Sequence, residues 1–291
     1  MLIANPIYDV VFKYMMEDLK VAKTFISAII GEQVQRLDFC PQEQTTKYKE
    51  GSLTVVRMDF LARIKTADGY KSVIIEMQKA LLSSDIRRFR RYVGSQYQSK
   101  SNEYKDKNKI VRARPIYCIF FLGKGLNVPG IPVLTVTNLV KDRATGRELK
   151  LRNEFIDCLH HKSWIVQISD LKDHRRDDLE KLLGIFDQNN ITDSIHLLKV
   201  KETNFPKKYT HIIRRLIQAA ESKEIADQMT AEDDLISEFQ DLERIIAAKE
   251  EMIEKKDKKL EEKDRMLEEN AKKLEERDKI IEELRQQANQ K

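Results

Sequence analysis

Two β-rich runs joined by a tight-turn sequence constrain this chain most. The runs LTVVRMDFLARIK (residues 53–65) and YKSVIIEMQKA (residues 70–80) are separated by Thr66-Ala67-Asp68-Gly69. Asp-Gly between alternating apolar residues is a strong hairpin signal, because both residues accept the positive φ of the favoured two-residue turns. The two runs are therefore expected to pair as antiparallel strands.

The segments around this hairpin predict an α/β fold. Apolar residues at spacings of three and four predict a helix over residues 6–30 that stops at Gly31, and QVQRLDF (33–39) predicts a strand. Residues 84–104 predict a second helix, and PIYCIFFLG (115–123) predicts a buried strand. The order helix, three strands, helix, strand indicates a small mixed sheet. Strands over 133–140 and 163–171 and helices over 175–188 and 207–229 are expected to extend the same domain.

Cysteine usage and the N-terminal residues limit the class of protein. Cys40, Cys118 and Cys158 are the only cysteines and form no CxxC pair, so we expect neither a disulfide framework nor a thiolate zinc site. Acidic residues stand where a signal peptide needs a basic and then an apolar stretch, and no apolar run reaches membrane length. These features predict a cytoplasmic protein with no membrane partner.

Charge is distributed unevenly along the chain. Residues 231–291 hold 20 acidic and 14 basic side chains, a net charge of −6, so the rest of this +5 chain carries +11. Within that basic part, residues 85–115 contain ten Lys or Arg against three Asp or Glu. A polyanion such as DNA is therefore the expected partner.

The charged C-terminal segment carries a heptad repeat, which divides the chain into a domain over residues 1–230 and a helix over residues 231–291. Apolar residues recur every seventh position at Phe239, Ile246, Ile253, Leu260, Leu267, Leu274 and Ile281. The position three residues later is apolar only at Leu242 and Leu284, so half of a coiled-coil seam is polar. Two interpretations stay open: a solvated helix supported by Glu/Lys pairs, or weak homo-oligomerisation.

Polar residues interrupt the two predicted hairpin strands in a pattern that suits metal chemistry. Strand alternation places Glu76 and Gln78 on one face and Met77 on the other, and Asp59 lies in the preceding strand among apolar residues. A carboxylate in such a run requires a reason, because burying it unpaired is costly. Two carboxylates on adjacent strands can bind a hard divalent cation, as metal-dependent phosphodiester cleavage requires.

MDFLARI, a hairpin and then IIEMQKA resemble the Asp, then Glu-x-Lys pattern of PD-(D/E)XK nucleases. With NPIYDVVFKYMMED, DIRRFRRYVGSQY and LLGIFDQ, residues 5 to about 190 resemble the PD-(D/E)XK nuclease family transposases, a group related to recombination-promoting nucleases. The resemblance implies a restriction-endonuclease-like core and a DNA endonuclease that uses Mg²⁺ or Mn²⁺. It further implies that Asp59, Glu76 and the backbone carbonyl of Met77 bind the metal.

Gln78 departs from the family pattern, because it stands where the usual residue is lysine. Its carbonyl oxygen can orient a water or bind a metal, but glutamine has no positive charge and is no general base. Lys79 is expected to lie on the opposite face of the strand. The resemblance also suggests that Asp9, on the first helix, supports the catalytic center, although a favourable interaction with the helix dipole explains an acid there equally well.

The helix after the hairpin carries the residues that we expect to contact DNA: Arg87, Arg88, Arg91, Tyr92 and Tyr97. Phosphate contacts of this kind are independent of base sequence and weaken with salt. Alternatively, the basic face is only solvated, or Arg87 and Arg91 neutralise the two strand carboxylates.

Two functions follow from these features. The first is a Mg²⁺-dependent deoxyribonuclease that hydrolyses phosphodiester bonds, with catalytic residues Asp59, Glu76 and Gln78, in recombination or mobile-element biology. The second is a nuclease-fold protein that lacks catalysis and binds nucleic acid or partner proteins, an alternative that Gln78 keeps open.

Overall fold

The computed structural model describes residues 1–291 except 41–58, 79–84, 127, 152 and 290–291. It divides into two units, Met1–Glu232 and Asp233–Lys291, which are considered separately. Among the described residues, no helix is both long enough and apolar enough to cross a membrane.

The first unit is built on a mixed sheet that has six strands within the described residues, in the order β2-β3-β4-β7-β9-β8. β3 is antiparallel to both of its neighbours, β2 and β4. β4, β7 and β9 are parallel, and β8 is antiparallel to β9. The strands are β2 (Arg36–Phe39), β3 (Asp59–Thr66), β4 (Gly69–Gln78), β7 (Ile116–Leu122), β8 (Val133–Val136) and β9 (Lys162–Gln167). The α/β class and the mixed sheet expected from the sequence are confirmed.

The hairpin that organises the sheet forms as predicted. Thr66 lies opposite Gly69 and the β3–β4 ladder runs back to Asp59 opposite Glu76. Gly69 has φ +115°, a conformation that favours glycine. The predicted part of the first strand that precedes Asp59 lies outside the described residues.

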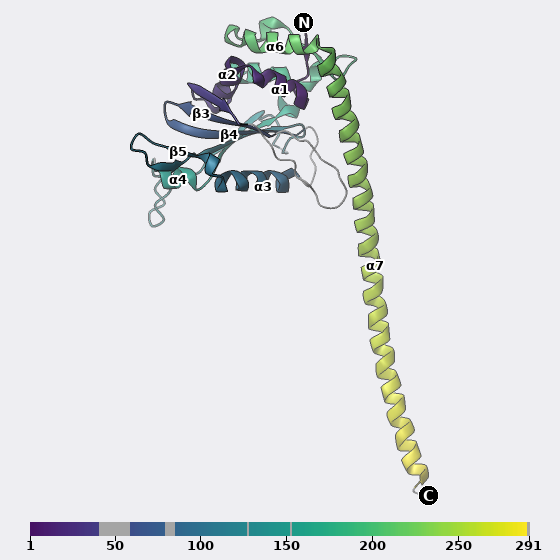
Figure 1. The fold of residues 1–291 in the computed structure, drawn as a ribbon. Helices are drawn as coiled ribbons and strands as arrows, with labels where there is room; N and C mark the ends of the chain where they lie inside the picture. Colours follow the sequence, from purple (N-terminus) through teal and green to yellow (C-terminus); the bar gives the residue numbers. More distant parts are fainter. Residues whose placement is uncertain (41–58, 79–84, 127, 152, 290–291) are drawn as a thin grey trace. The chain divides into compact units, whose positions relative to one another are not determined.

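Helices cover both faces of the sheet (Figure 1). α1 (Asp9–Glu17) and α2 (Leu19–Ile30) lie on one side, where their apolar faces form the main core with Ile75 and Phe121. α3 (Asp85–Gln98) lies on the other side and forms a smaller core with Leu61, Ile74 and Cys118. The two cores use alternate residues of the same strands, as pleating requires.

The single helix predicted over residues 6–30 is wrong in one respect, since Asp18 divides it. Asp18 ends α1 and caps α2, with its carboxylate accepting hydrogen bonds from the backbone N–H groups of Lys20 and Val21 at 2.8 and 3.1 Å. Such a side-chain cap satisfies N–H groups that a helix start leaves unpaired. Gly31 ends α2 as predicted, in a left-handed conformation with φ +71°.

The remaining elements of this unit are short. The second predicted helix ends at Gln98 rather than near residue 104, because the chain continues into a small hairpin of β5 (Glu103–Lys105) and β6 (Val111–Ala113). β1 (Leu2–Ala4) pairs with β10 (Leu197–Lys199), which joins segments far apart in sequence. The other helices are α4 (Glu154–Cys158), α5 (Asp178–Leu183) and α6 (Thr210–Ala220).

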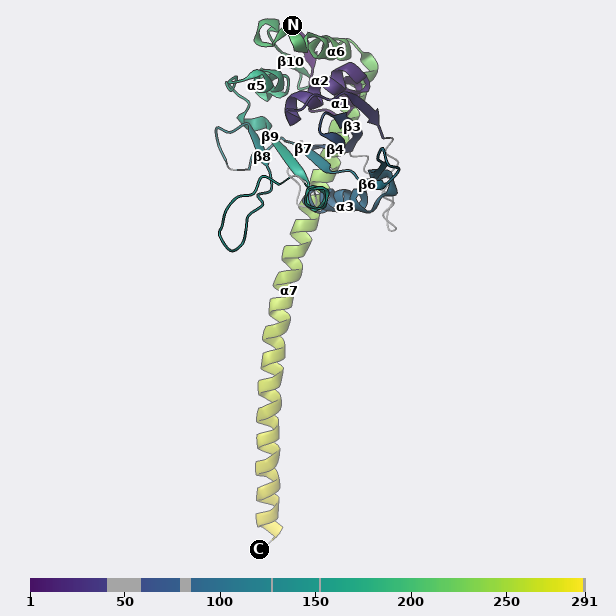
Figure 2. The same cartoon turned by 90° about the vertical axis from the view of Figure 1, so that its left-hand side faces the viewer.

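A long C-terminal helix, α7, is confirmed. It runs from Lys223 to Asn289, and its first turns, with Ile225 and Met229, are buried in the main core of the first unit. The second unit begins at Asp233 within the same helix. Figure 2 gives a second view of the sheet and its helices.

Candidate functional site

Two carboxylate residues of the hairpin strands are direct neighbours across the sheet. The Cα atoms of Asp59 and Glu76 are register partners in the antiparallel β3–β4 ladder. Residues opposite one another in such a ladder lie on the same face, with Cβ atoms about 4.5–5.5 Å apart. The side chain of Asp59 lies outside the description, whereas Glu76 is only 1% exposed. The register thus brings together the two acids that the sequence singled out.

Glu76 occupies the sheet face that α3 covers. Its strand neighbour Ile74 belongs to the smaller core, and its partner in β7 is Phe120, whose ring lies 4.4 Å from that of Phe89 in α3. A carboxylate in these apolar surroundings is a candidate for metal binding, because an ionised group inside a protein is stable only with strong compensating interactions.

Gln78 and Met77 continue the strand as the sequence predicts. Met77 packs against the main core, on the opposite face from Glu76, while Gln78 is the last residue of β4 and lies opposite Leu122 of β7. The described part of the β3–β4 ladder ends at the Asp59–Glu76 pair. The structure does not describe the side chain of Gln78, and Lys79 lies outside the described residues.

α3 places only some of its expected DNA-contacting residues away from the sheet. Phe89, Tyr92 and Gln96 are buried and define its inward stripe. At ~100° per residue, positions 87 and 91 lie on the opposite side of the helix. The side chains of Arg87, Arg88 and Arg91 are outside the description.

The two tyrosines of α3 differ in accessibility. Tyr92 is buried in the smaller core, so its ring is not at the surface where we had expected it to contact DNA. Tyr97 is 42% exposed, and its hydroxyl lies 3.4 Å from Nδ1 of His161. Partial burial of the phenol raises the pKa of Tyr97 to about 12, so it is a neutral hydrogen-bonding group at physiological pH.

Asp9 is the first residue of α1 and lies on the helix layer that covers the other face of the sheet (Figure 1). Its carboxylate forms an ion pair with Lys13 at 3.1 Å, one helical turn away. Its backbone N–H donates a hydrogen bond to Oε2 of Glu232 at 2.9 Å. These contacts agree with the helix-dipole interpretation of Asp9.

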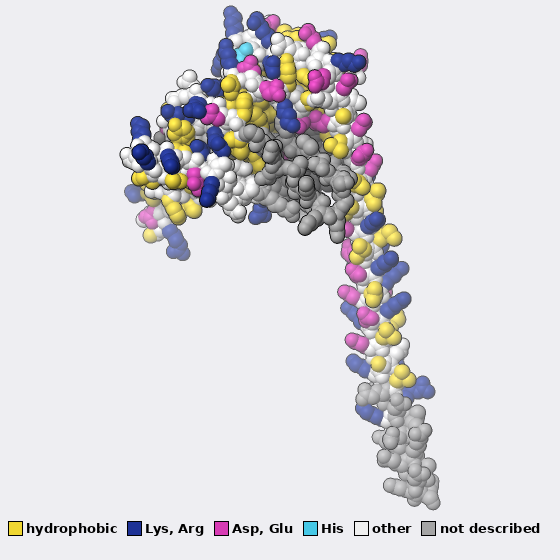
Figure 3. All heavy atoms as spheres, viewed as in Figure 1, with side chains coloured by type: hydrophobic (Ala, Val, Ile, Leu, Met, Phe, Trp, Pro, Cys, Tyr) yellow, Lys and Arg dark blue, Asp and Glu magenta, His cyan; other side chains and the backbone are white. Residues whose placement is uncertain are grey.

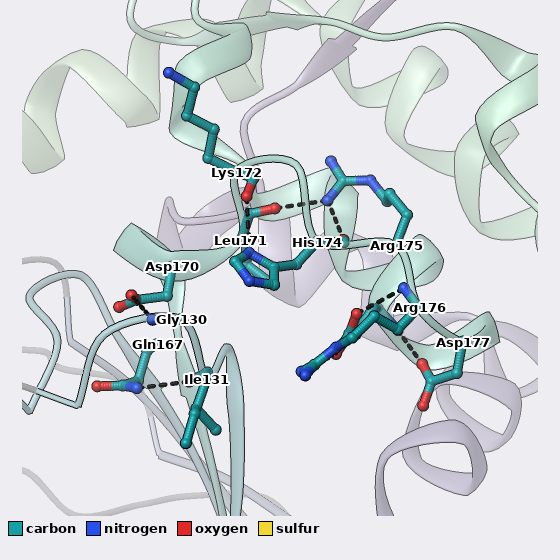
Figure 4. Close-up of polar contacts among 11 residues, drawn as sticks. Gly130, Ile131, Gln167, Asp170, Leu171, Lys172, His174, Arg175, Arg176 and Asp177 are labelled. Atoms are coloured by element: carbon teal, nitrogen blue, oxygen red, sulfur yellow. Dashed lines mark hydrogen bonds and ion pairs between the residues drawn. The ribbon is translucent and has the colours of Figure 1, made fainter.

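The carboxyl ends of the parallel strands carry a polar network that the sequence did not single out. Gln167, at the end of β9, is completely buried, and its amide holds the loop after β7 by accepting from the Leu126 N–H at 2.6 Å and donating to the Ile131 carbonyl at 2.6 Å. Asp170 accepts from the Gly130 N–H at 3.0 Å (Figure 4). The sequence feature that could have indicated this network is the Gln167 amide, at the end of a mainly apolar strand.

The same region is fixed from the other side by Arg175. Its guanidinium donates to the carbonyl oxygens of Leu171 and His174 at 2.6 and 2.5 Å (Figure 4). It also pairs with Asp187 at 3.1 Å. These contacts fix the segment after β9, and the end of β9 at Gln167 lies at the same edge of the sheet as Gln78 of β4. Ligands of open α/β sheets bind at this carboxyl edge.

The opposite end of the sheet holds a buried ion pair that sequence analysis missed. Lys71, at the start of β4, contacts the Glu32 carboxylate and the Thr66 hydroxyl, the latter at 2.8 Å, and Glu32 also accepts from the Tyr117 hydroxyl at 3.1 Å. Burial opposes ionisation of Glu32, but the Lys71 ammonium outweighs it and lowers the pKa of Glu32. Burial, with the adjacent Glu32 charge, raises the pKa of Tyr117. All four groups find partners within the fold, so we assign them a structural role.

The donors at Asp59 and Glu76 fit a hard divalent cation, because carboxylate oxygens are what Mg²⁺ prefers and the strand register places the two acids opposite one another. Among the described residues, which do not include the Asp59 side chain, no group of three or more His, Cys, Asp or Glu could hold a metal ion. Comparison with protein-family models finds no match to the chain, and comparisons with curated proteins and with solved structures find none either.

Proposed function

We propose that the protein is a DNA endonuclease that uses Mg²⁺ or Mn²⁺ and has a restriction-endonuclease-like core. The observation that carries the proposal is the pairing of Asp59 with Glu76 across β3 and β4, with Glu76 buried. The hairpin, the α3 crossover and the parallel β7 occur in the order expected of that core. The resemblance of these segments to PD-(D/E)XK nuclease family transposases supports the same assignment.

In this proposal Asp59 and Glu76 hold the cation, with the Met77 carbonyl as a further oxygen donor. The cation would supply Lewis-acid stabilisation of the phosphate and a bound water of lowered pKa. Gln78 would orient the attacking water through its amide oxygen. Glutamine neither accepts the proton nor offsets negative charge, so the proton from the water must pass to solvent or to a phosphate oxygen.

DNA is the proposed substrate because basic side chains are exposed on the first unit, Met1–Glu232. In the segment 85–115, Lys100, Lys105, Lys107 and Lys109 are exposed, and Figure 3 shows Lys and Arg side chains over the region of β5 and α4. Cations spread in this way bind phosphates without reading bases. Cleavage of this kind would serve recombination or mobile-element biology, as the family resemblance implies.

Incubation of supercoiled plasmid with purified protein and Mg²⁺ or Mn²⁺ tests the proposal. We expect nicked and then linear DNA from the wild type, no products with EDTA, and a loss of at least about 100-fold in rate for Asp59→Ala, Glu76→Ala and Glu76→Gln, about 2.7 kcal/mol in activation free energy. Asp68→Asn is the matched control. It changes an exposed acid at the turn of the same hairpin and keeps a turn-compatible sequence.

A wild type that binds DNA and leaves it intact with either metal would refute the endonuclease. That outcome would favour the second candidate function, a nuclease-fold protein that binds nucleic acid without cutting it. Gln78 in place of lysine is the specific feature that favours this alternative. Circular dichroism of each variant establishes that lost activity does not come from unfolding.

A further inference from the structure

The second unit carries an apolar stripe that no described part of the chain covers. Ile246, Ile253, Leu260, Leu267 and Leu274, spaced seven residues apart, are 54–65% exposed. Figure 3 shows hydrophobic side chains recurring along this helix among charged ones. From Ile246 to Leu274 the stripe runs along ~42 Å of helix.

Charge pairs along α7 support the helix itself without explaining the stripe. Lys255 pairs with Glu251 at 2.6 Å and Lys258 with Glu254 at 2.7 Å, each with the acid four residues before the base. Such pairs favour a solvated helix. A solvated helix has no need of an aliphatic residue at every seventh position, whereas a seam between two helices does.

The occupant that matches the stripe is a second copy in parallel orientation. With the stripe as heptad position a, position e is acidic at Glu250, Asp257 and Asp264. Position g is apolar at Ile245, Met252 and Met266 and basic at Lys259. Parallel pairing brings g of one helix to the following e of its partner, so Lys259 meets Asp264 of the other copy. Antiparallel pairing would bring the row of acidic e positions against itself, which is repulsive.

The cations at position d also fit the parallel arrangement. Lys249, Lys256 and Lys263 each precede one of the acidic e residues, and in a parallel pair a d side chain inserts beside e of the partner. Each of these ammonium groups, at the edge of the seam, therefore has a carboxylate of the partner helix within reach. In register, Lys249, Lys256 and Lys263 also face their own counterparts, and the neighbouring e carboxylates offset this repulsion only in part. The association is therefore weak compared with that of a fully apolar seam.

One residue of the d row favours a single alignment. Asn270 is a neutral amide in a row otherwise cationic from Lys249 to Arg277. With both copies in register, Asn270 meets its own counterpart and the two amides can hydrogen-bond, whereas a slip of one heptad places it opposite Lys263 or Arg277. A single polar residue in a seam sets register in this way.

We infer that α7 pairs with α7 of a second copy as a parallel, in-register coiled coil. The inference does not depend on nuclease activity. It places both N-terminal units at the same end of the paired helices, because each is joined to the start of its helix.

Disulfide trapping in the full-length protein tests the inference. Ile246→Cys and Leu274→Cys occupy position a at two ends of the described stripe. In a parallel, in-register pair, each cysteine lies opposite its own counterpart within the ~4.4–6.8 Å Cα separation that a disulfide tolerates. We expect each variant alone to form a covalent dimer on mild oxidation, and a mixture to form no disulfide between the two different variants, because in register their cysteines are ~42 Å apart along the helix.

Arg265→Cys is the control, because position 265 lies on the outer side of the pair and should give no more dimer than wild type with its three native cysteines. Crosslinks found only in the mixture of the two stripe variants would indicate antiparallel pairing and overturn the inference. Wild type that sediments as a monomer at every concentration would also overturn it. Leu260→Asp combined with Leu267→Asp should abolish the wild-type dimer while circular dichroism keeps its helical signal.

Discussion

Replacing Glu32 with glutamine should destabilise the first unit strongly although it lies far from the candidate site. The change leaves the Lys71 ammonium, whose side chain is 6% exposed, with the Thr66 hydroxyl and the Tyr117 ring, 5.1 Å away, as its remaining contacts. Removing one partner of a buried ion pair costs roughly 3–5 kcal/mol. We expect a loss at the low end, about 3 kcal/mol, because the Glu32 side chain is 21% exposed and the glutamine oxygen can still accept a hydrogen bond. This corresponds to a loss of about 6–12 °C in Tm for a unit of this size.

Urea unfolding followed by tryptophan fluorescence measures this loss in unfolding free energy. Trp164 is the only tryptophan, and its ring lies 5.1 Å from that of Tyr117. The double variant Glu32→Leu, Lys71→Met is the matched control and should recover most of the loss, since apolar pairs replace buried ion pairs at little cost. An unchanged midpoint for Glu32→Gln would refute this account of the pair.

The pair also predicts a pH dependence. The folded-state pKa of Glu32 is lowered, so its stabilisation is fully present above the ordinary value of 4.5 and is lost as pH falls through the folded value. The difference between wild type and Glu32→Gln should therefore shrink below about pH 4.5. A difference that stays constant from pH 7 to pH 3 would contradict this assignment of the charges.

Three further substitutions test local features of the fold. Asp18→Ala removes the cap of α2 and should cost about 1 kcal/mol in unfolding free energy, measured by urea denaturation; Asp18→Ser should retain most of it. Gly31→Ala places a side chain at positive φ with no atom within 4 Å, so a loss of about 1 kcal/mol would come from backbone strain alone, and no loss would contradict that cause. Gln167→Leu removes the amide that holds the loop at Leu126, so limited proteolysis should cut this loop faster than in wild type while the sheet persists; equal cleavage rates would show that the clamp is dispensable.

Local sequence patterns predicted the hairpin and the central strands because their signals are strong and short-range. Asp68-Gly69 specifies the turn, and the turn then sets the register that brings Asp59 opposite Glu76. The break at Asp18 was missed because apolar spacing continues across it, so the periodicity alone does not reveal that a capping carboxylate restarts the helix.

Features that depend on distant partners could not be predicted from local pattern. β1 is three residues long and exists because β10, nearly two hundred residues later, pairs with it. Lys71 has the appearance of a surface residue in a strand, and only the tertiary fold brings Glu32 to it. The sequence named both Tyr92 and Tyr97 as DNA contacts, and only the packing of the helix distinguishes Tyr92, buried in the smaller core, from the exposed Tyr97.

The rate of metal-dependent plasmid cleavage by Glu76→Gln, relative to wild type, tests the central claim most directly. The measurement should use protein concentrations at which both bind the DNA fully, so that the ratio reports on catalysis rather than affinity. The account predicts Mg²⁺- or Mn²⁺-dependent cleavage by wild type and by Asp68→Asn, and a rate at least about 100-fold lower for Glu76→Gln. Equal cleavage by wild type and Glu76→Gln, with both folded, would contradict it.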